Sequence, residues 1–87
     1  MKLKDGFILT EIGDEHILVP AIETAHYGHV VRMNDTAAFI VEQLRKDVSR
    51  EQIVDALLDQ YEVEKSEAEQ NVNEIIEKMR SINALEE

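Results

Sequence analysis

The spacing of hydrophobic and polar positions changes about a third of the way along the chain. In the first third, apolar residues come in two short runs, Phe7 to Ile12 and Ile17 to Val19, with Gly13-Asp14 between them. Short runs rich in strand formers that flank a two-residue turn predict a β-hairpin. Pro20 has no amide to donate to a ladder, so we expect the second strand to end there.

A loop and a third short strand are expected after the hairpin. Residues Ala21 to Gly28 carry no readable pattern and are interpreted as a loop that Gly28 closes. The next residues, His29 to Met33, predict a short strand. Such a strand leaves unpaired amides and carbonyls along one edge, and a protein either covers such an edge or uses it to bind another chain.

Beyond this strand the apolar residues recur at helical spacing. Asn34 is a good N-cap and Asp35 complements the helix dipole, so the first helix is predicted to run from about Asp35 to Arg45-Lys46. Ser49 followed by Gln52 has the form of a capping box and predicts the start of a second helix. The apolar stripes of these two helices are Ala37, Ile40, Val41 and Leu44, and then Ile53, Val54, Leu57, Leu58 and Tyr61.

A third helix is predicted from about Lys65 to Ile82, with Asn83 as a left-handed C-cap. We expect one margin of its apolar stripe to pack on the core and the other to line a groove; the pattern does not say which. The stripe consists of Ala68, Val72, Ile75, Ile76, Met79 and Ile82, with Val72, Ile75 and Met79 expected at its centre and Ile76 and Ile82 toward opposite margins.

Three strands followed by three amphipathic helices predict a fold in which one antiparallel sheet buries the apolar faces of the helices. The fold class is therefore α+β, of winged-helix type. With 87 residues and no recognisable linker, residues 1–87 are expected to form a single domain.

Charge and cysteine content exclude several classes of protein. Nineteen acidic residues against nine basic ones give a net charge of −10, which repels phosphate backbones. The chain has no cysteine, which excludes disulfides, thiolate nucleophiles and cysteine metal sites and favours an intracellular, cytoplasmic location. No signal peptide and no apolar stretch of membrane-spanning length occur in the sequence, so no membrane association is expected.

The sequence carries only weak patterns for catalysis or metal binding. His16, His26 and His29 lie within fourteen residues of one another but match no standard ligand spacing, so scattered histidines are favoured over a metal site. The three glycines stand far apart, which excludes a glycine-rich phosphate loop, and no Ser-His-Asp context is present. The sequence predicts no enzyme, no cofactor and no metal.

A winged-helix layout often binds DNA, but the fold alone does not determine this function and the charge of the chain decides between the alternatives. A recognition helix normally brings lysine and arginine to phosphates. The second expected helix instead offers Arg50 among Glu51, Asp55 and Asp59. We therefore expect no nucleic-acid partner.

Three segments, taken in order, resemble the PqqD-like family, named for pyrroloquinoline quinone biosynthesis protein D. They are the opening Leu3 to Leu9, the strand-to-helix passage Val31 to Ile40 and the run Ile53 to Val63, and the closing Leu85-Glu86-Glu87 fits as well. The likeness covers about residues 3 to 87. Two positions depart from the family pattern: Asn83 stands where glycine is usual, and Val41 where an aromatic residue is common.

The resemblance implies a non-catalytic peptide chaperone. Members of the family bind the leader of a ribosomally made precursor peptide and present it to a modifying enzyme, frequently of the radical S-adenosylmethionine type. In the family the leader adds a strand to the sheet, in the groove between the third strand and the third helix. The implied peptide-binding residues here are Val30, Val31, Arg32, Met33, Val72, Ile75, Ile76 and Met79.

The residues themselves add two expectations to this picture. By strand alternation, Val31 and Met33 point inward, whereas Val30 and Arg32 take the other face. The scarce positive charges Arg32, Lys78 and Arg80 are candidates to meet an acidic leader. Two alternatives stay open at this point: a structural or regulatory subunit of a maturation enzyme that touches no peptide, and a vestigial DNA-binding domain.

Overall fold

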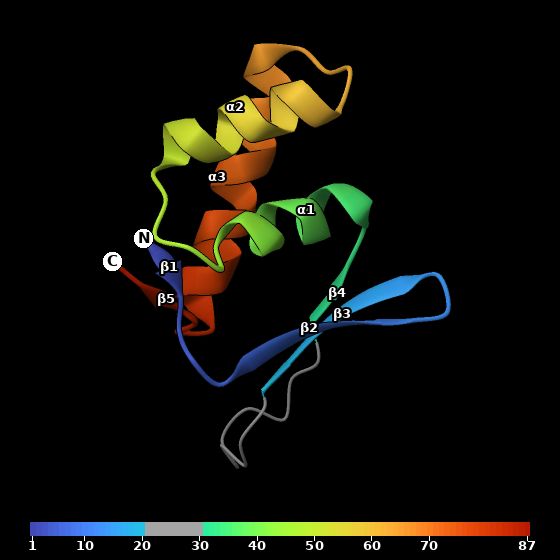
Figure 1. Ribbon diagram of the computed structural model, residues 1–87, viewed down its shortest axis with the longest axis vertical. Helices are drawn as coiled ribbons and strands as arrows, with labels where there is room; N and C mark the ends of the chain where they lie inside the picture. The colour runs from blue at the N-terminus through green and yellow to red at the C-terminus, as the bar shows by residue number, and fades with distance from the viewer. Residues whose placement is uncertain (21–30) are drawn as a thin grey trace.

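An antiparallel sheet and a layer of helices form the fold of this chain, whose computed structural model describes residues 1–20 and 31–87 (Figure 1). Within these ranges the sheet consists of β2 (Phe7–Ile12), β3 (Glu15–Pro20) and β4 (Val31–Met33), in that order. The helices that follow are α1 (Asp35–Gln43), α2 (Arg50–Gln60) and α3 (Lys65–Ser81). The predicted α+β class and the order of its elements are confirmed.

The hairpin of β2 and β3 turns at Gly13-Asp14, as the sequence predicts. Ile12 pairs with Glu15 across this two-residue turn, and Gly13 has a φ of 61°. A positive φ at the first central position favours glycine, which has no Cβ to clash there. The second strand ends at Pro20, also as expected. The loop predicted for Ala21 to Gly28 and the first two residues of the strand predicted at His29 to Met33 lie outside the described residues.

Side chains at the helix ends determine where the helices begin and stop. The side chain of Asn34 accepts a hydrogen bond from the amide of Ala37 at 2.8 Å, which starts α1. Ser49 and Gln52 form both bonds of the predicted capping box at the start of α2. Asn83, with a φ of 57°, adopts the left-handed conformation expected after α3. These three predictions are confirmed.

The hydrophobic core lies between the sheet and the helices. Leu18 and Met33 face it from the sheet, and the predicted stripe of α1 is buried throughout. α1 packs on all three strands and on both other helices, so it forms the middle of the structure (Figure 1). The fully enclosed large side chains are Leu18, Ile40, Leu44, Ile53, Leu57, Ile76, Met79, Val41 and Val72.

The stripe of α3 is rotated from the arrangement that the sequence led us to expect. Ile76 has no exposed surface and lies at the centre of the stripe, in a row with Ala68, Val72 and Met79. Ile75, expected at the centre, is only partly buried and lies at a margin. The helical pattern alone could not fix this rotation, because α3 packs against α1 and α2 together and their contact selects the row.

A second, very small sheet joins the two ends of the chain and was not predicted. Lys2 pairs with Glu86 and Leu3 with Leu85, forming β1 (Lys2–Leu3) and β5 (Leu85–Glu86). The amide of Leu3 also donates to the carbonyl of Leu44 at 2.7 Å. Two-residue strands are too short to show a period, so the sequence pattern carries no signal for them.

The capping box of α2 provides a test of this local structure. We expect Ser49→Ala to lower the free energy of unfolding by about 1 kcal/mol, because the amide of Gln52 loses its acceptor. Ser66→Ala is the matched control, since Ser66 is exposed in the first turn of α3, where Glu64 and not Ser66 is the N-cap. Urea denaturation of both variants measures the difference; equal midpoints would contradict the role of the cap.

Candidate functional site

β4 is the edge strand of the described sheet, and its outer side is the first part of the candidate site. Among the described residues, the strand order β2-β3-β4 gives β4 a partner strand on one side only. It pairs with β3 through Val31 opposite Leu18, Arg32 opposite Ile17 and Met33 opposite His16. An edge of this kind is a ready template for a further strand.

The register shows which main-chain groups of β4 face outward. Ile12 and Glu15 flank a two-residue turn and therefore form a hydrogen-bonded pair, and such pairs alternate along an antiparallel ladder. Ile17 then directs its amide and carbonyl toward β2, which turns the intervening residues His16 and Leu18 toward β4. It follows that Val31 and Met33 bond to β3, whereas the amide and carbonyl of Arg32 point to the open edge.

The side chains of β4 alternate as the sequence predicts. Met33 is 9% exposed and faces the core, Val31 is half-buried, and the side chain of Arg32 is 75% exposed. Arg32 approaches Glu15 at 3.8 Å, a distance typical of a weak surface ion pair. Val30, also predicted to belong to the site, lies outside the described residues.

A hollow of about 300 Å³ lies where β4 passes into α1 and forms the second part of the site. We call it the α1–α3 hollow; its walls come from the N-terminal part of α1 and from α3. It is lined by Asn34, Thr36, Ala37, Ile40, Glu67, Asn71, Glu74 and Ile75. From the predicted apolar stripe of α3, Ile75 is among the residues that line this hollow.

The eight residues predicted to bind peptide fall into different environments. Val31, Arg32 and Ile75 are at least partly exposed around the strand edge and the α1–α3 hollow. Val72, Ile76 and Met79 have no exposed surface, and Met33 has little. The side chains of these four residues belong to the hydrophobic core and support the three exposed residues from beneath.

The three candidate cations of the site, Arg32, Lys78 and Arg80, differ in how far carboxylates of the chain already pair with them. The guanidinium of Arg80 donates to Glu77 at 2.5 Å and to both carboxylate oxygens of Glu87 at 2.6 and 2.9 Å. Hydrogen bonds from Arg80 hold the pKa of the Glu87 carboxyl below its ordinary value. Arg80 is therefore engaged within the chain, whereas Arg32 has only its weak surface pair with Glu15, and Lys78 is exposed and forms no ion pair with any of the described residues.

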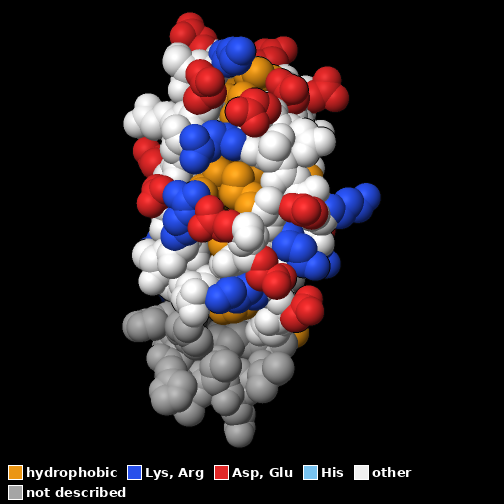
Figure 2. Space-filling view, turned by 90° about the vertical axis from the view of Figure 1, so that its left-hand side faces the viewer, with side chains coloured by type: hydrophobic (Ala, Val, Ile, Leu, Met, Phe, Trp, Pro, Cys, Tyr) orange, Lys and Arg blue, Asp and Glu red, His pale blue; other side chains and the backbone are white. Residues whose placement is uncertain are grey.

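The surface charge is mixed on the side of the molecule that carries the two termini. Figure 2 shows Lys and Arg side chains interspersed there with Asp and Glu side chains around an apolar patch. A protein that follows a nucleic-acid backbone normally presents a continuous basic stripe. The face in Figure 2 presents none.

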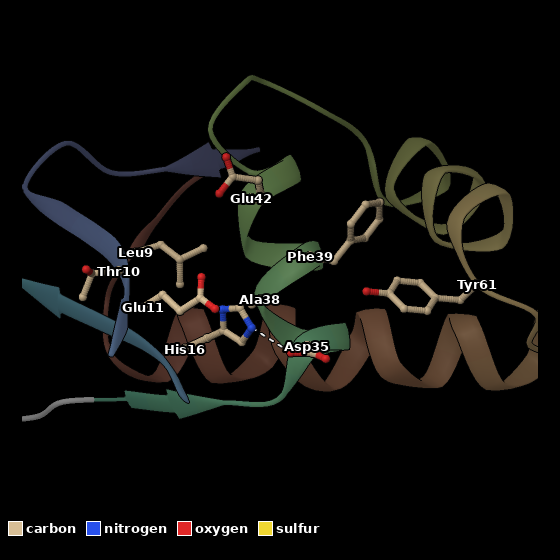
Figure 3. Close-up of a pocket in the computed structure, with 9 residues that line it drawn as sticks. All are labelled: Leu9, Thr10, Glu11, His16, Asp35, Ala38, Phe39, Glu42 and Tyr61. Carbon is tan, nitrogen blue, oxygen red and sulfur yellow. Dashed lines mark hydrogen bonds and ion pairs between the residues drawn. The ribbon is translucent and has the colours of Figure 1, made fainter. Parts of the chain in front are cut away.

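A second and larger hollow, of about 510 Å³, lies on the other side of α1, between that helix and the hairpin (Figure 3). We call it the hairpin hollow. Leu9, Phe39 and Tyr61 give it an apolar lining, and Glu11, Asp35 and Glu42 give it carboxylates. Sequence reasoning missed it, because its residues come from β2, β3, α1 and the C-cap Tyr61 of α2, and no local pattern joins them.

Histidines and carboxylates do not combine into a metal site in the described ranges. His16 shares a hydrogen bond with Asp35 at 2.7 Å, and this bond ties β3 to the start of α1. Among the described residues, no three side chains of His, Cys, Asp or Glu come close enough together to hold a metal ion. His26 and His29 lie outside these residues. None of the helices in the described ranges is long and apolar enough to span a membrane.

Comparison with solved structures places this fold. The chain is similar to TbiB1 in complex with the TbiA(beta) leader peptide, with a TM-score of 0.77 and 24% identity, covering 99% of this chain and 95% of that one. It is also similar to lasso peptide synthetase B1 complexed with the leader peptide, with a TM-score of 0.73 and 23% identity over 95% and 93% of the two chains. No curated protein matches the sequence.

The fold and the open strand edge define a small winged-helix-like α+β domain. The family model described as coenzyme PQQ synthesis protein D (PqqD) matches residues 15–85. The chain belongs to the PqqD family, as the sequence resemblance indicated. Membership of this family also confirms the prediction that the chain is not an enzyme.

Proposed function

We propose that this chain binds the leader segment of a ribosomally made precursor peptide at β4 and presents the peptide to a modifying enzyme. The observation that supports this most strongly is the open edge of β4, beside a hollow lined by Ile75, in a domain of the PqqD family. The two solved structures compared above are complexes with leader peptides. The proposed partner enzyme is of the radical S-adenosylmethionine type and the proposed location is the cytoplasm.

Strand addition is the proposed mode of binding. The leader pairs with the outward amide and carbonyl of Arg32, and its apolar side chains contact Val31 and Ile75. Met33, Val72, Ile76 and Met79 support the groove from within the core. Val30 stays part of the proposed site on the strength of the family resemblance.

The energies of such a contact are compatible with reversible capture. Main-chain hydrogen bonds along the edge, two of them at Arg32, contribute roughly 0.5 to 1.5 kcal/mol each, and two or three buried side chains about 1.5 to 3 kcal/mol each. Ordering the leader costs a few kcal/mol. The balance corresponds to a dissociation constant of about micromolar or somewhat lower. A chaperone that must release its peptide needs an affinity in this range.

Titration of a fluorescein-labelled leader tests the proposal. The probe is the leader of a precursor whose gene lies next to the gene of this chain. We expect it to bind with about micromolar affinity, measured by fluorescence anisotropy. A scrambled leader of the same composition is the control for charge alone. Equal binding of both peptides, or no binding of either, would contradict the proposal and favour a subunit that touches no peptide.

Reconstitution tests the role of the modifying enzyme. Because the chain acts by binding, we expect no modified precursor from the chain alone and efficient modification only when the chain and the radical S-adenosylmethionine enzyme are combined. Mass spectrometry of the precursor measures the product. Full modification by the enzyme without this chain would contradict the role of the chain in presentation.

A further inference from the structure

The hairpin hollow plays no part in the proposed leader site, yet it has features of a binding surface. Phe39 and Tyr61 contact each other edge to face, with ring centroids 5.7 Å apart, and both rings remain partly exposed. Leu9 and Ala38 continue this apolar lining toward the sheet. Partly exposed aromatic rings in a hollow are a favourable site for a flat or cationic side chain.

The polar groups of the hairpin hollow are predominantly acidic. Glu11, Asp35 and Glu42 provide three carboxylates, against the single imidazole of His16 (Figure 3). Asp35 bonds to His16 at 2.7 Å, and Glu42 pairs with Arg45 at 2.9 Å. Glu11 has no ion pair in the part of the chain that the structure describes. The hollow therefore has an unneutralised carboxylate beside its apolar lining.

We infer that the hairpin hollow is a docking site for an arginine side chain of the modifying enzyme. A guanidinium combines the two properties that this lining complements: it stacks on aromatic rings and forms paired hydrogen bonds with carboxylates. The side chains of Asp35 and Glu42 are 80% and 49% exposed, so the acidic rim is open to another protein. The assignment of the partner rests on the proposed function.

The position of the hollow suits a protein that must hold two partners at once. α1 separates the two sites: Thr36, Ala37 and Ile40 line the α1–α3 hollow, whereas Ala38, Phe39 and Glu42 line the hairpin hollow. A leader on β4 therefore leaves the hairpin hollow free. Simultaneous binding of leader and enzyme is what presentation requires.

A titration with a defined probe tests the chemistry of the hollow. The probe is acetyl-Gly-Arg-Gly-amide, added to the ¹⁵N-labelled chain, and the matched control is the same peptide with neutral citrulline in place of arginine. We expect saturable amide shifts at Thr10, Glu11 and Phe39 with the arginine peptide, and at least fivefold weaker binding of the citrulline peptide. Equal binding of the two peptides, or shifts confined to other surfaces, would overturn the inference.

Two variants separate this site from the leader site. The double variant Glu11→Gln, Glu42→Gln should weaken the arginine peptide at least fivefold and the modifying enzyme at least tenfold, with leader affinity unchanged. Glu74→Gln, in the α1–α3 hollow, is the control and should leave arginine-peptide binding unchanged.

Unchanged enzyme binding by the double variant, or an equal loss of leader affinity, would overturn the assignment of the hollow to the enzyme. The proposed function fails separately, if the wild-type chain binds no leader. The arginine-peptide titration is read without a leader, so the two failures are distinguishable.

Discussion

Replacing Arg32 by proline should weaken leader binding by about 30-fold to 1000-fold. Proline removes the outward amide of the edge strand and leaves a leader carbonyl without its donor, a loss of about 2 to 4 kcal/mol with the clash of the ring included. The β3–β4 ladder keeps its bonds, because the register directs Val31 and Met33, and not Arg32, toward β3. The variant should therefore remain folded.

Arg32→Ala is the matched control for this substitution. It removes the exposed guanidinium but retains the amide, so we expect only a few-fold loss of affinity, which reports the charge alone. Circular dichroism establishes that both variants fold, and anisotropy with the labelled leader measures their affinities. Normal binding by the proline variant would show that the leader does not add to this edge.

Truncation of the neighbouring residues Ile75 and Ile76 of α3 should affect different properties, leader affinity for Ile75 and stability for Ile76. Ile76→Ala leaves a cavity in the core and should lower the free energy of unfolding by about 2 to 5 kcal/mol. Ile75→Ala removes a partly exposed wall of the α1–α3 hollow and should cost clearly less stability. Its main effect should be on leader affinity, a loss of about 1 to 2 kcal/mol or roughly 5-fold to 30-fold.

Urea denaturation and leader titration of the two variants measure these effects side by side. Ile76→Ala is compared at a temperature at which it remains folded, so that its leader affinity reports the groove and not the unfolded fraction. If Ile75→Ala bound the leader as tightly as the wild type, Ile75 would have to be removed from the proposed contacts.

Much of the fold follows from local patterns, because each element carries its own signal. The turn at Gly13-Asp14, the capping box of Ser49 and Gln52 and the left-handed Asn83 are properties of a few adjacent residues. Such interactions act within one turn of the chain, so sequence alone suffices to predict them. The short pairing of β1 with β5 escapes prediction because its two strands meet only in the folded chain.

The candidate site was less predictable, because it depends on how elements pack. The pattern placed Ile75 at the centre of the apolar stripe of α3 and Ile76 at its margin. In the structure Ile76 lies at the centre of the stripe and Ile75 at its margin. One step of a helix is a rotation of about 100°, and only the contact with α1 and α2 selects between neighbouring faces. In the same way, Leu9 and Tyr61 come together in the hairpin hollow through tertiary structure alone.

The most direct test of strand addition is amide hydrogen exchange at Arg32, measured by nuclear magnetic resonance with and without saturating leader. The amide of Arg32 faces the open edge, whereas those of Val31 and Met33 already bond to β3. We predict that exchange at Arg32 slows by about tenfold or more when the leader binds, with smaller changes at its two neighbours. Unchanged exchange at Arg32 under saturating leader would contradict the account.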